Sequence, residues 1–251
     1  KILPTPIVIH HHGAGGFVKD GSADWLDEEP KASYLKAIMQ STGCAVAGSH
    51  ACGDHWGNAD AVAANAALFN ALKDMVNVSQ DRIGLMGGGL GGALVWNSVL
   101  GPLAGSVKCV VVMQAASSLE GVIRERKFRS PLLAAYSLPE DTSDEEAIAQ
   151  VAPHDPLPRF QKLARGARLP RTAIYHGAKD ENLPPHMHAT PLAEALKKAG
   201  GEVKLELFLG VGHAVYAMGK DIETHLKSFF SSSLGVGTGQ HLKTEQSRRR
   251  A

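Results

Sequence analysis

Residues 81–94 read Asp-Arg-Ile-Gly-Leu-Met-Gly-Gly-Gly-Leu-Gly-Gly-Ala-Leu, a short apolar run, a cluster of glycines and then helix-forming residues. This order predicts a β-strand, a tight turn and the start of an α-helix. Glycines in such a turn let the strand and the helix approach closely, and they adopt backbone angles that other residues avoid. The segment therefore predicts one strand–turn–helix unit of an α/β fold.

Similar apolar, β-branched runs repeat along the chain and alternate with longer amphipathic segments. This alternation is typical of βαβ units around a mainly parallel sheet. We therefore expect a three-layer α/β/α sandwich with a mostly parallel, twisted sheet of about six strands. The expected strands are Pro6–His11, Ala45–Gly48, Arg82–Met86, Val107–Gln114, Thr172–His176 and Val203–Leu209. The expected helices are about Pro30–Gln40, Asn58–Met75, Leu90–Leu100, Pro191–Ala199 and Lys220–Phe230.

The length and composition of the chain predict a single domain. The 251 residues are 44% hydrophobic and 20% charged, which suffices for one sizeable core but not for two. Residues 1–230 are expected to form this domain, with residues 117–168 inserted after a strand as a small lid. Residues 231–251 are rich in Ser and Gly and then polar and basic, so they predict a disordered tail.

Charge, hydropathy and cysteine usage exclude several classes of protein. The formal net charge is +1 with acids and bases well mixed, so no nucleic-acid partner is expected. The longest apolar run, Cys109–Met113, is too short to cross a membrane. Cys44, Cys52 and Cys109 are irregularly spaced and predict free thiols, which fits a cytoplasmic location. The chain begins at a lysine, so a trimmed upstream segment and export stay open.

The glycine-rich turn has the spacing of a nucleophile elbow. In the pattern Gly-x-Ser-x-Gly a serine stands at the centre of a strained strand-to-helix turn, and here Gly87 and Gly91 flank Gly89. Glycine has no hydroxyl, so a serine ester intermediate cannot form at this position. The alternative is a phosphate-binding loop, but Gly-x-Gly-x-x-Gly alone is weak evidence. The next strand also lacks the terminal acid that would bind a ribose.

Three further loops carry the other groups that acyl transfer needs. The strand that ends at His11 leads into small residues, so N–H groups near Ala14 can form an oxyanion hole with that of Leu90. Asp180 follows a strand and can hold an imidazole in the useful tautomer. His213 follows the last strand and is the natural general base. Each residue alone also fits an ordinary turn or cap, and the order of all of them favours the joint interpretation.

Together these segments resemble the α/β-hydrolase superfamily, in particular its small esterase-like or dienelactone-hydrolase-like serine hydrolases, over residues 5 to 230. The resemblance implies hydrolysis of a carboxylic ester or related acyl bond of a small molecule, without a cofactor. It gives Asp180 and His213 their usual roles and places Gly89 at the serine position. The resemblance therefore implies a protein that is inactive or impaired in hydrolysis.

The loop at residues 50–58 looks like the wall-forming loop of some small bacterial esterase-like members. This resemblance makes His12, His50 and Trp56 candidates for the lining of the pocket. Two groups of side chains also suggest a metal site, namely the three successive histidines His10, His11 and His12, and the loop residues His50, Asp54 and His55. Adjacent strand residues face opposite sides, and a loop capped by Asn58 is the simpler interpretation. We therefore expect no metal.

Gly89 leaves four accounts of function open. In the first, it is an engineered substitution in a working serine hydrolase. In the second, the chain is a natural non-catalytic relative that binds a small ligand or a partner. In the third, His213 activates a water molecule in the space that the serine side chain would fill. In the fourth, Ser117, Ser118 or Cys52 serves as a substitute nucleophile.

Overall fold

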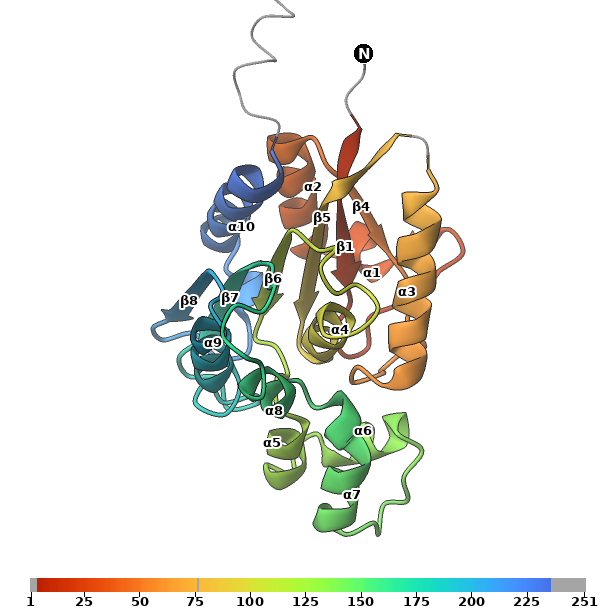
Figure 1. Cartoon of the computed structure of the whole chain (residues 1–251), viewed down its shortest axis with the longest axis vertical. Coiled ribbons are helices and arrows are strands. Elements are labelled where there is room, and N and C mark those ends of the chain that lie inside the picture. Colours follow the sequence, from red (N-terminus) through yellow and green to blue (C-terminus); the bar gives the residue numbers. More distant parts are fainter. Residues whose placement is uncertain (1–3, 76, 236–251) are drawn as a thin grey trace, which may run out of the picture.

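The computed structural model describes residues 4–75 and 77–235 and contains a six-stranded sheet with helices on both faces (Figure 1). The strands run parallel in the order β4-β1-β5-β6-β7-β8. Their bounds are β1 Thr5–His11, β4 Ala45–Gly48, β5 Val78–Gly88, β6 Cys109–Met113, β7 Arg171–Gly177 and β8 Val203–Phe208. A two-stranded antiparallel ribbon, β2 (Val18–Lys19) and β3 (Ser22–Ala23), follows β1. The expected α/β-hydrolase architecture is confirmed.

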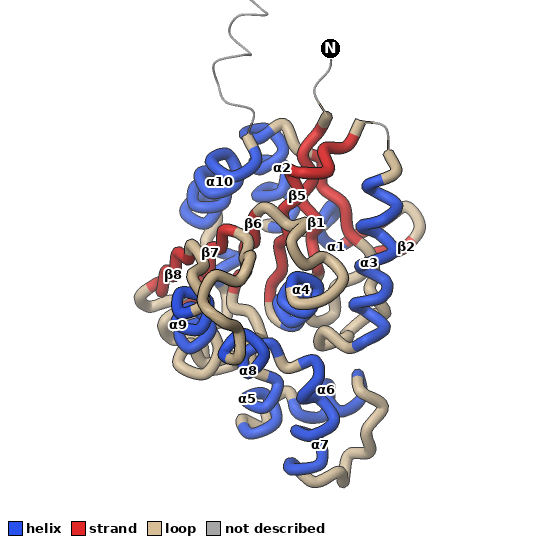
Figure 2. Tube along the Cα trace, viewed as in Figure 1, coloured by secondary structure: helices blue, strands red, loops and turns tan. Residues whose placement is uncertain are grey.

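The two faces of the sheet bury two separate apolar clusters, because alternate strand residues point to opposite sides. In β1, Ile7 and Ile9 face the cluster that is shared with helices α3, α4 and α9. Val8 faces the cluster that is shared with α2 and α10. Figure 2 shows these helices in blue on the two sides of the red strands. The helix bounds are α2 Lys31–Thr42, α3 Ala59–Lys73, α4 Leu90–Val99, α9 Ala189–Lys198 and α10 Lys220–Leu234, with a short α1 at Asp24–Asp27.

A group of short helices lies between β6 and β7, where the sequence predicts a lid, and this segment is called the lid below. Its elements are α5 Leu119–Arg124, α6 Arg129–Ala135, α7 Asp144–Val151, a 3₁₀ turn at Ala152–His154 and α8 Pro156–Gln161. Figure 1 places them below the carboxyl ends of the strands. Their buried side chains, among them Leu119 and Leu132, pack with Leu90 and Trp56 of the main domain. The lid is therefore anchored over the edge of the sheet at which the predicted site residues lie.

Several element bounds differ from the sequence expectations. Strand β5 begins at Val78, earlier than expected, because Val78 pairs with Thr5 of β1 before a bulge, and regular pairing resumes at Ile83. Helix α10 extends to Leu234, so residues 231–234 belong to the domain and not to the expected tail. The rest of that expected tail, residues 236–251, lies outside the described residues. The β2–β3 ribbon was not expected, since its strands are only two residues long.

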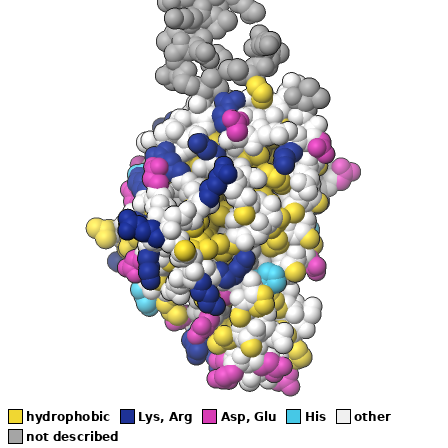
Figure 3. All heavy atoms as spheres, viewed as in Figure 1, with side chains coloured by type: hydrophobic (Ala, Val, Ile, Leu, Met, Phe, Trp, Pro, Cys, Tyr) yellow, Lys and Arg dark blue, Asp and Glu magenta, His cyan; other side chains and the backbone are white. Residues whose placement is uncertain are grey.

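The surface of the face shown in Figure 3 carries mixed charge. Lys and Arg side chains lie among acidic and apolar ones over most of this face, and acidic side chains gather at its lower end. That end contains the lid, where the first turn of α7 carries Asp144, Glu145 and Glu146. In the part of the chain that the structure describes, no helix has the length and apolar character that crossing a bilayer requires.

Candidate active site

The turn between β5 and α4 has the geometry of a nucleophile elbow. Strand β5 ends at Gly88, helix α4 begins at Leu90, and Gly89 between them has φ 52° and ψ −127°. This positive φ is strained for residues with a side chain and free for glycine. The Gly89 N–H donates to the Met113 carbonyl at 3.3 Å, and its carbonyl accepts from the Ala116 N–H at 2.9 Å. The turn is therefore fixed to the end of the neighbouring strand β6.

The glycines that flank the turn are needed for close approach. A Cβ atom on Gly91 would lie 2.3 Å from the His12 carbonyl oxygen and 2.7 Å from that of His11. A Cβ atom on Gly87 would lie 2.8 Å from the Gly91 carbonyl oxygen. Both contacts are shorter than van der Waals distance, so helix α4 could not sit this close to β1 and β5 with larger residues there.

We expect Gly91→Ala to lower the free energy of unfolding by about 1–3 kcal/mol, because backbone must move to admit the methyl group. The matched control is Gly13→Ala. A Cβ there would meet only the Gly88 backbone, at 3.5 Å or more, so it should cost much less. Urea unfolding of both variants measures the difference. Equal midpoints for the two variants would show that the helix tolerates a larger residue at Gly91.

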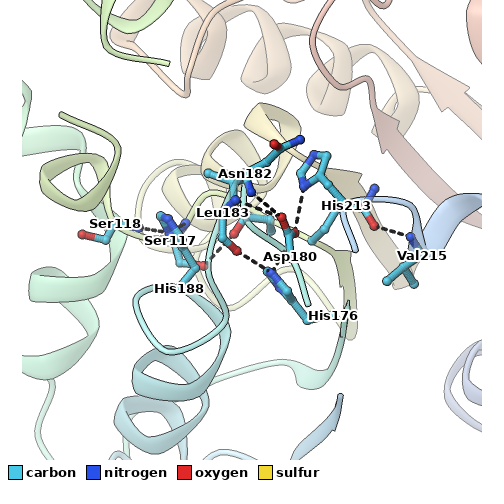
Figure 4. Close-up of polar contacts among 11 residues, drawn as sticks. Ser117, Ser118, His176, Asp180, Asn182, Leu183, His188, His213 and Val215 are labelled. Carbon is cyan, nitrogen blue, oxygen red and sulfur yellow. Dashed lines mark hydrogen bonds and ion pairs between the residues drawn. The ribbon is translucent and has the colours of Figure 1, made fainter. Parts of the chain in front are cut away.

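Asp180 and His213 form a close pair at the carboxyl end of the sheet (Figure 4). The Nδ1 atom of His213 lies 2.8 Å from Oδ2 of Asp180. An ionised carboxylate only accepts hydrogen bonds, so Nδ1 donates and the Nε2 atom keeps its lone pair. The other carboxylate oxygen accepts the N–H groups of Asn182 at 2.9 Å and Leu183 at 3.0 Å. The pair therefore presents an imidazole in the tautomer that can accept a proton.

Burial alone would raise the pKa of Asp180, which is 3% exposed. Hydrogen bonds from His176, His213 and the Leu183 N–H outweigh this effect and hold the pKa of Asp180 well below its usual range. A carboxyl group with a depressed pKa stabilises the fold above its unfolded pKa, near 3.9, and this contribution is lost as the pH falls through the folded value. Asp180 is thus ionised throughout the neutral range.

This linkage predicts how the stability of the Asp180→Asn variant, relative to the native chain, changes with pH. The variant should be less stable than the native chain at pH 7, and the difference should shrink as the pH falls below about 4, where the unfolded carboxyl is protonated. Urea unfolding at pH 7, 5 and 3 measures the free energy of unfolding of the variant and of the native chain. A difference that stays constant over this range would mean that the carboxylate gains no stabilisation in the fold.

His176, which was not among the predicted site residues, also binds the acid. It lies in β7, its side chain is fully buried, and its Nε2 atom is 3.1 Å from Oδ2 of Asp180 and 2.7 Å from the Leu183 carbonyl. Both partners accept, so Nε2 carries the proton. The available signal was its position at the end of a strand, four residues before the acid. His176 therefore holds both the acid and the turn that follows it.

His188 connects the acid turn region to the start of the lid. Its Nδ1 atom accepts the N–H groups of Ser117 and Ser118, each at 3.2 Å (Figure 4). Burial lowers the pKa of His188 to about 3, so the ring is neutral at physiological pH. Gln114 has a similar connecting role, because its Oε1 atom accepts the Val215 N–H at 2.9 Å, two residues after His213. These contacts fix the histidine loop and the lid start on the sheet.

A cavity of about 470 Å³ opens in front of the elbow. Gly89, Leu90, His213 and Ala14 all line it, so the structure brings these predicted residues to one space. Trp56 lines it as well and lies 5.8 Å from the lid's Phe128, ring centre to ring centre. Leu183 adds a further apolar wall residue. Polar wall residues come from the α1–α2 region and from the loop before α10, namely Glu28, Glu29, Lys31, Tyr34 and Tyr216.

His12 and His50 are not on the wall of this cavity, contrary to the sequence expectation. The ring of His12 is buried with Nδ1 2.8 Å from the Gly13 carbonyl and Nε2 2.8 Å from the His50 carbonyl. The exposed His50 ring stacks on it at 5.7 Å. The contact joins the Gly13 loop to the loop at residues 50–58. The N–H of Gly15 strengthens this junction by donating to Asp54 at 2.8 Å.

The remaining candidates do not line the cavity, or their polar atoms are engaged in local contacts. Ser117, Ser118 and Cys52 are not among the described residues that line the cavity. The Ser118 hydroxyl accepts the Gly121 N–H as a helix cap. His55 Nδ1 accepts the Gly57 N–H at 2.9 Å. Within residues 4–75 and 77–235, no group of three or more His, Cys, Asp or Glu side chains is placed to hold a metal ion.

A family model described as the prolyl oligopeptidase family matches residues 43–237. The chain belongs to the prolyl oligopeptidase family. The match contains the elbow, Asp180 and His213, and it confirms the α/β-hydrolase resemblance of the sequence. No curated protein matches the chain.

Solved structures of α/β-hydrolases share the fold at low identity. A puromycin-hydrolysing peptidase of Mycobacterium tuberculosis is 19% identical with a TM-score of 0.66, covering 93% of this chain and 35% of the peptidase. This family member therefore spans about a third of that peptidase's length. A truncated carbohydrate esterase from gut microbiota is 17% identical with a TM-score of 0.68, over 93% and 87% of the two chains. An S-formylglutathione hydrolase from Agrobacterium tumefaciens is 16% identical with a TM-score of 0.64, covering 93% of this chain and 86% of the hydrolase.

Proposed function

We propose that this family member is a serine-hydrolase-type protein whose cavity takes a small carboxylic ester or a related acyl compound, with Gly89 at the nucleophile position. The observation that carries the proposal is the elbow conformation of Gly89, φ 52° and ψ −127°, in the same cavity as His213. The family and the printed names of the structural relatives, peptidases and esterases, support an acyl substrate. Without a hydroxyl at Gly89 the chain lacks serine-based turnover.

The other parts of the proposed site have separate roles. Asp180 orients His213 through Nδ1, and His213 Nε2 is the general base. The N–H groups of Ala14 and Leu90 form the proposed oxyanion hole, since Ala14 lines the cavity and the first N–H groups of a helix have no acceptor within it. No cofactor or nucleic acid enters this proposal. The free cysteines Cys44, Cys52 and Cys109 support a cytoplasmic location.

The second candidate is a natural non-catalytic relative that binds a small ligand in the retained cavity of about 470 Å³. This candidate does not require the Asp180–His213 pair in a proton-accepting tautomer, so the pair favours the first proposal. The two candidates make opposite predictions for a hydroxyl restored at the elbow.

A fluorophosphonate, an electrophile that labels activated serines, tests the proposal. The Gly89→Ser variant should take up one equivalent, with the label at position 89, and the native chain should take up none there. Adding His213→Ala to the variant should slow labelling strongly, since the base is lost. A folded Gly89→Ser variant that stays unlabelled would contradict the proposal and leave ligand binding as the better account.

A further inference from the structure

The space in front of Gly89 is open on the side where a side chain would point. A Cβ atom on Gly89 would have only the Gly13 Cα within contact range, at 4.0 Å. Gly13 and Gly88, which have no side chains, border the same cavity. A Cβ atom at position 89 would therefore meet no close protein atom, which leaves room for a small group beside Gly89.

A proton acceptor faces the same cavity. His213 donates from Nδ1 to Asp180, so its Nε2 atom carries the lone pair, and the side chain is 24% exposed and lines the cavity. If Nε2 takes a proton, the buried Asp180 carboxylate stabilises the imidazolium at a distance of 2.8 Å. The chain has therefore kept the base, its orienting acid and the space for a small nucleophile.

The serines and the cysteine that could replace the missing nucleophile are not placed to use this base. Among the described residues, Ser117, Ser118 and Cys52 do not line the cavity. Tyr34 lines it, but burial raises the pKa of Tyr34 well above its usual range, so its phenolate does not form at neutral pH. Water is the small nucleophile that can enter the space at Gly89.

We propose that the native chain hydrolyses activated esters slowly, with a water molecule beside Gly89 as the nucleophile and His213 as its base. The inference rests on the proposed function, because it uses the same cavity and the same histidine. His213 Nε2 takes a proton from water as the water oxygen bonds to the ester carbonyl carbon, and the carbonyl oxygen becomes an oxyanion. Collapse of this intermediate breaks the bond to the leaving oxygen. Protonated His213 gives its proton to the leaving oxygen, so the products are one carboxylic acid and one alcohol.

The expected rate is far below that of a serine hydrolase. An oxyanion hole and substrate binding alone leave roughly 10³–10⁴-fold acceleration over water when a triad member is removed. The reaction has no acyl-enzyme intermediate, so product should form linearly from the first turnover, without a burst.

The test compares the native chain with Gly89→Ala and His213→Ala on p-nitrophenyl acetate. Gly89→Ala adds a methyl group in the space assigned to water and should lower the rate about 10- to 100-fold. His213→Ala should lower it about 100-fold or more. The matched control is His225→Gln. This half-buried histidine pairs with Glu206, outside the cavity, and its replacement should leave the rate unchanged.

Gly89→Ser separates this inference from the proposed function, because it imposes the same backbone strain as Gly89→Ala. Both proposals are supported if Gly89→Ser is the fastest, the native chain is slower and Gly89→Ala is the slowest. A native rate equal to that of Gly89→Ala or His213→Ala overturns the water inference, whatever Gly89→Ser does. A Gly89→Ser rate no higher than native contradicts the proposed function instead. Circular dichroism confirms that each variant is folded before the rates are compared.

Discussion

Replacing Gly89 by serine is expected to raise kcat/KM for p-nitrophenyl acetate or butyrate by at least about 1,000-fold over the native chain. The elbow conformation is already present at Gly89, and the nearest atom to an added Cβ is the Gly13 Cα at 4.0 Å. The hydroxyl would thus enter an existing site rather than form a new one. Initial rates of p-nitrophenol release from the two purified proteins measure the gain.

This gain should come with a loss of stability. A residue with a side chain at φ 52° carries strain of about 1–3 kcal/mol, which glycine avoids. The Gly89→Ser variant should therefore melt a few degrees below the native chain, roughly 2–4 °C for each kcal/mol. Higher activity together with a lower melting temperature is the expected combination. A variant that is less stable and equally inactive would contradict the account of the elbow.

Asp180→Asn in the Gly89→Ser background is expected to lower kcat about 10⁴-fold. An asparagine amide can donate to Nδ1 of His213 and so favour the tautomer in which Nε2 carries the proton and cannot act as a base. The fold should survive, because the backbone N–H groups of Asn182 and Leu183, which bond to Oδ1 of Asp180, can bond to the amide oxygen.

The control for this loss is Glu181→Gln, which removes a neighbouring, exposed carboxylate that does not line the cavity. It should leave kcat unchanged within about twofold, since an exposed charge is screened by solvent. Rates of both double variants on p-nitrophenyl butyrate separate the specific effect from a general change in charge. Equal losses in the two would place the catalytic acid elsewhere.

The inner strands of the sheet were predictable because they are buried on both faces and are therefore nearly continuous apolar runs, as in Cys109–Met113. The residues of β5 before Ile83 are mostly polar, so their composition does not predict a strand. The register with β1 decides that segment. The lid helices are short and their mutual packing is non-local, so the sequence indicated only that the regular alternation is interrupted there.

The elbow, Asp180 and His213 were identifiable because each follows a strand, and parallel strands bring their carboxyl ends to one edge. The roles of His12 and His176 depend on which carbonyl or carboxylate oxygen each ring meets. The His50 carbonyl is 38 residues from His12 in the chain, so no local sequence pattern predicts that contact. His176 was visible only as a strand residue, although its bond to Asp180 spans four positions.

Acylation of position 89 during turnover tests the central claim most directly. The Gly89→Ser variant is mixed with excess p-nitrophenyl butyrate, quenched with acid within the first turnovers, and its intact mass and peptides are measured. The account predicts one butyryl group on the serine introduced at position 89 and none at that position in the native chain. A folded, active variant whose acyl group is on another residue, or on none, would contradict the assignment of Gly89 to the nucleophile position.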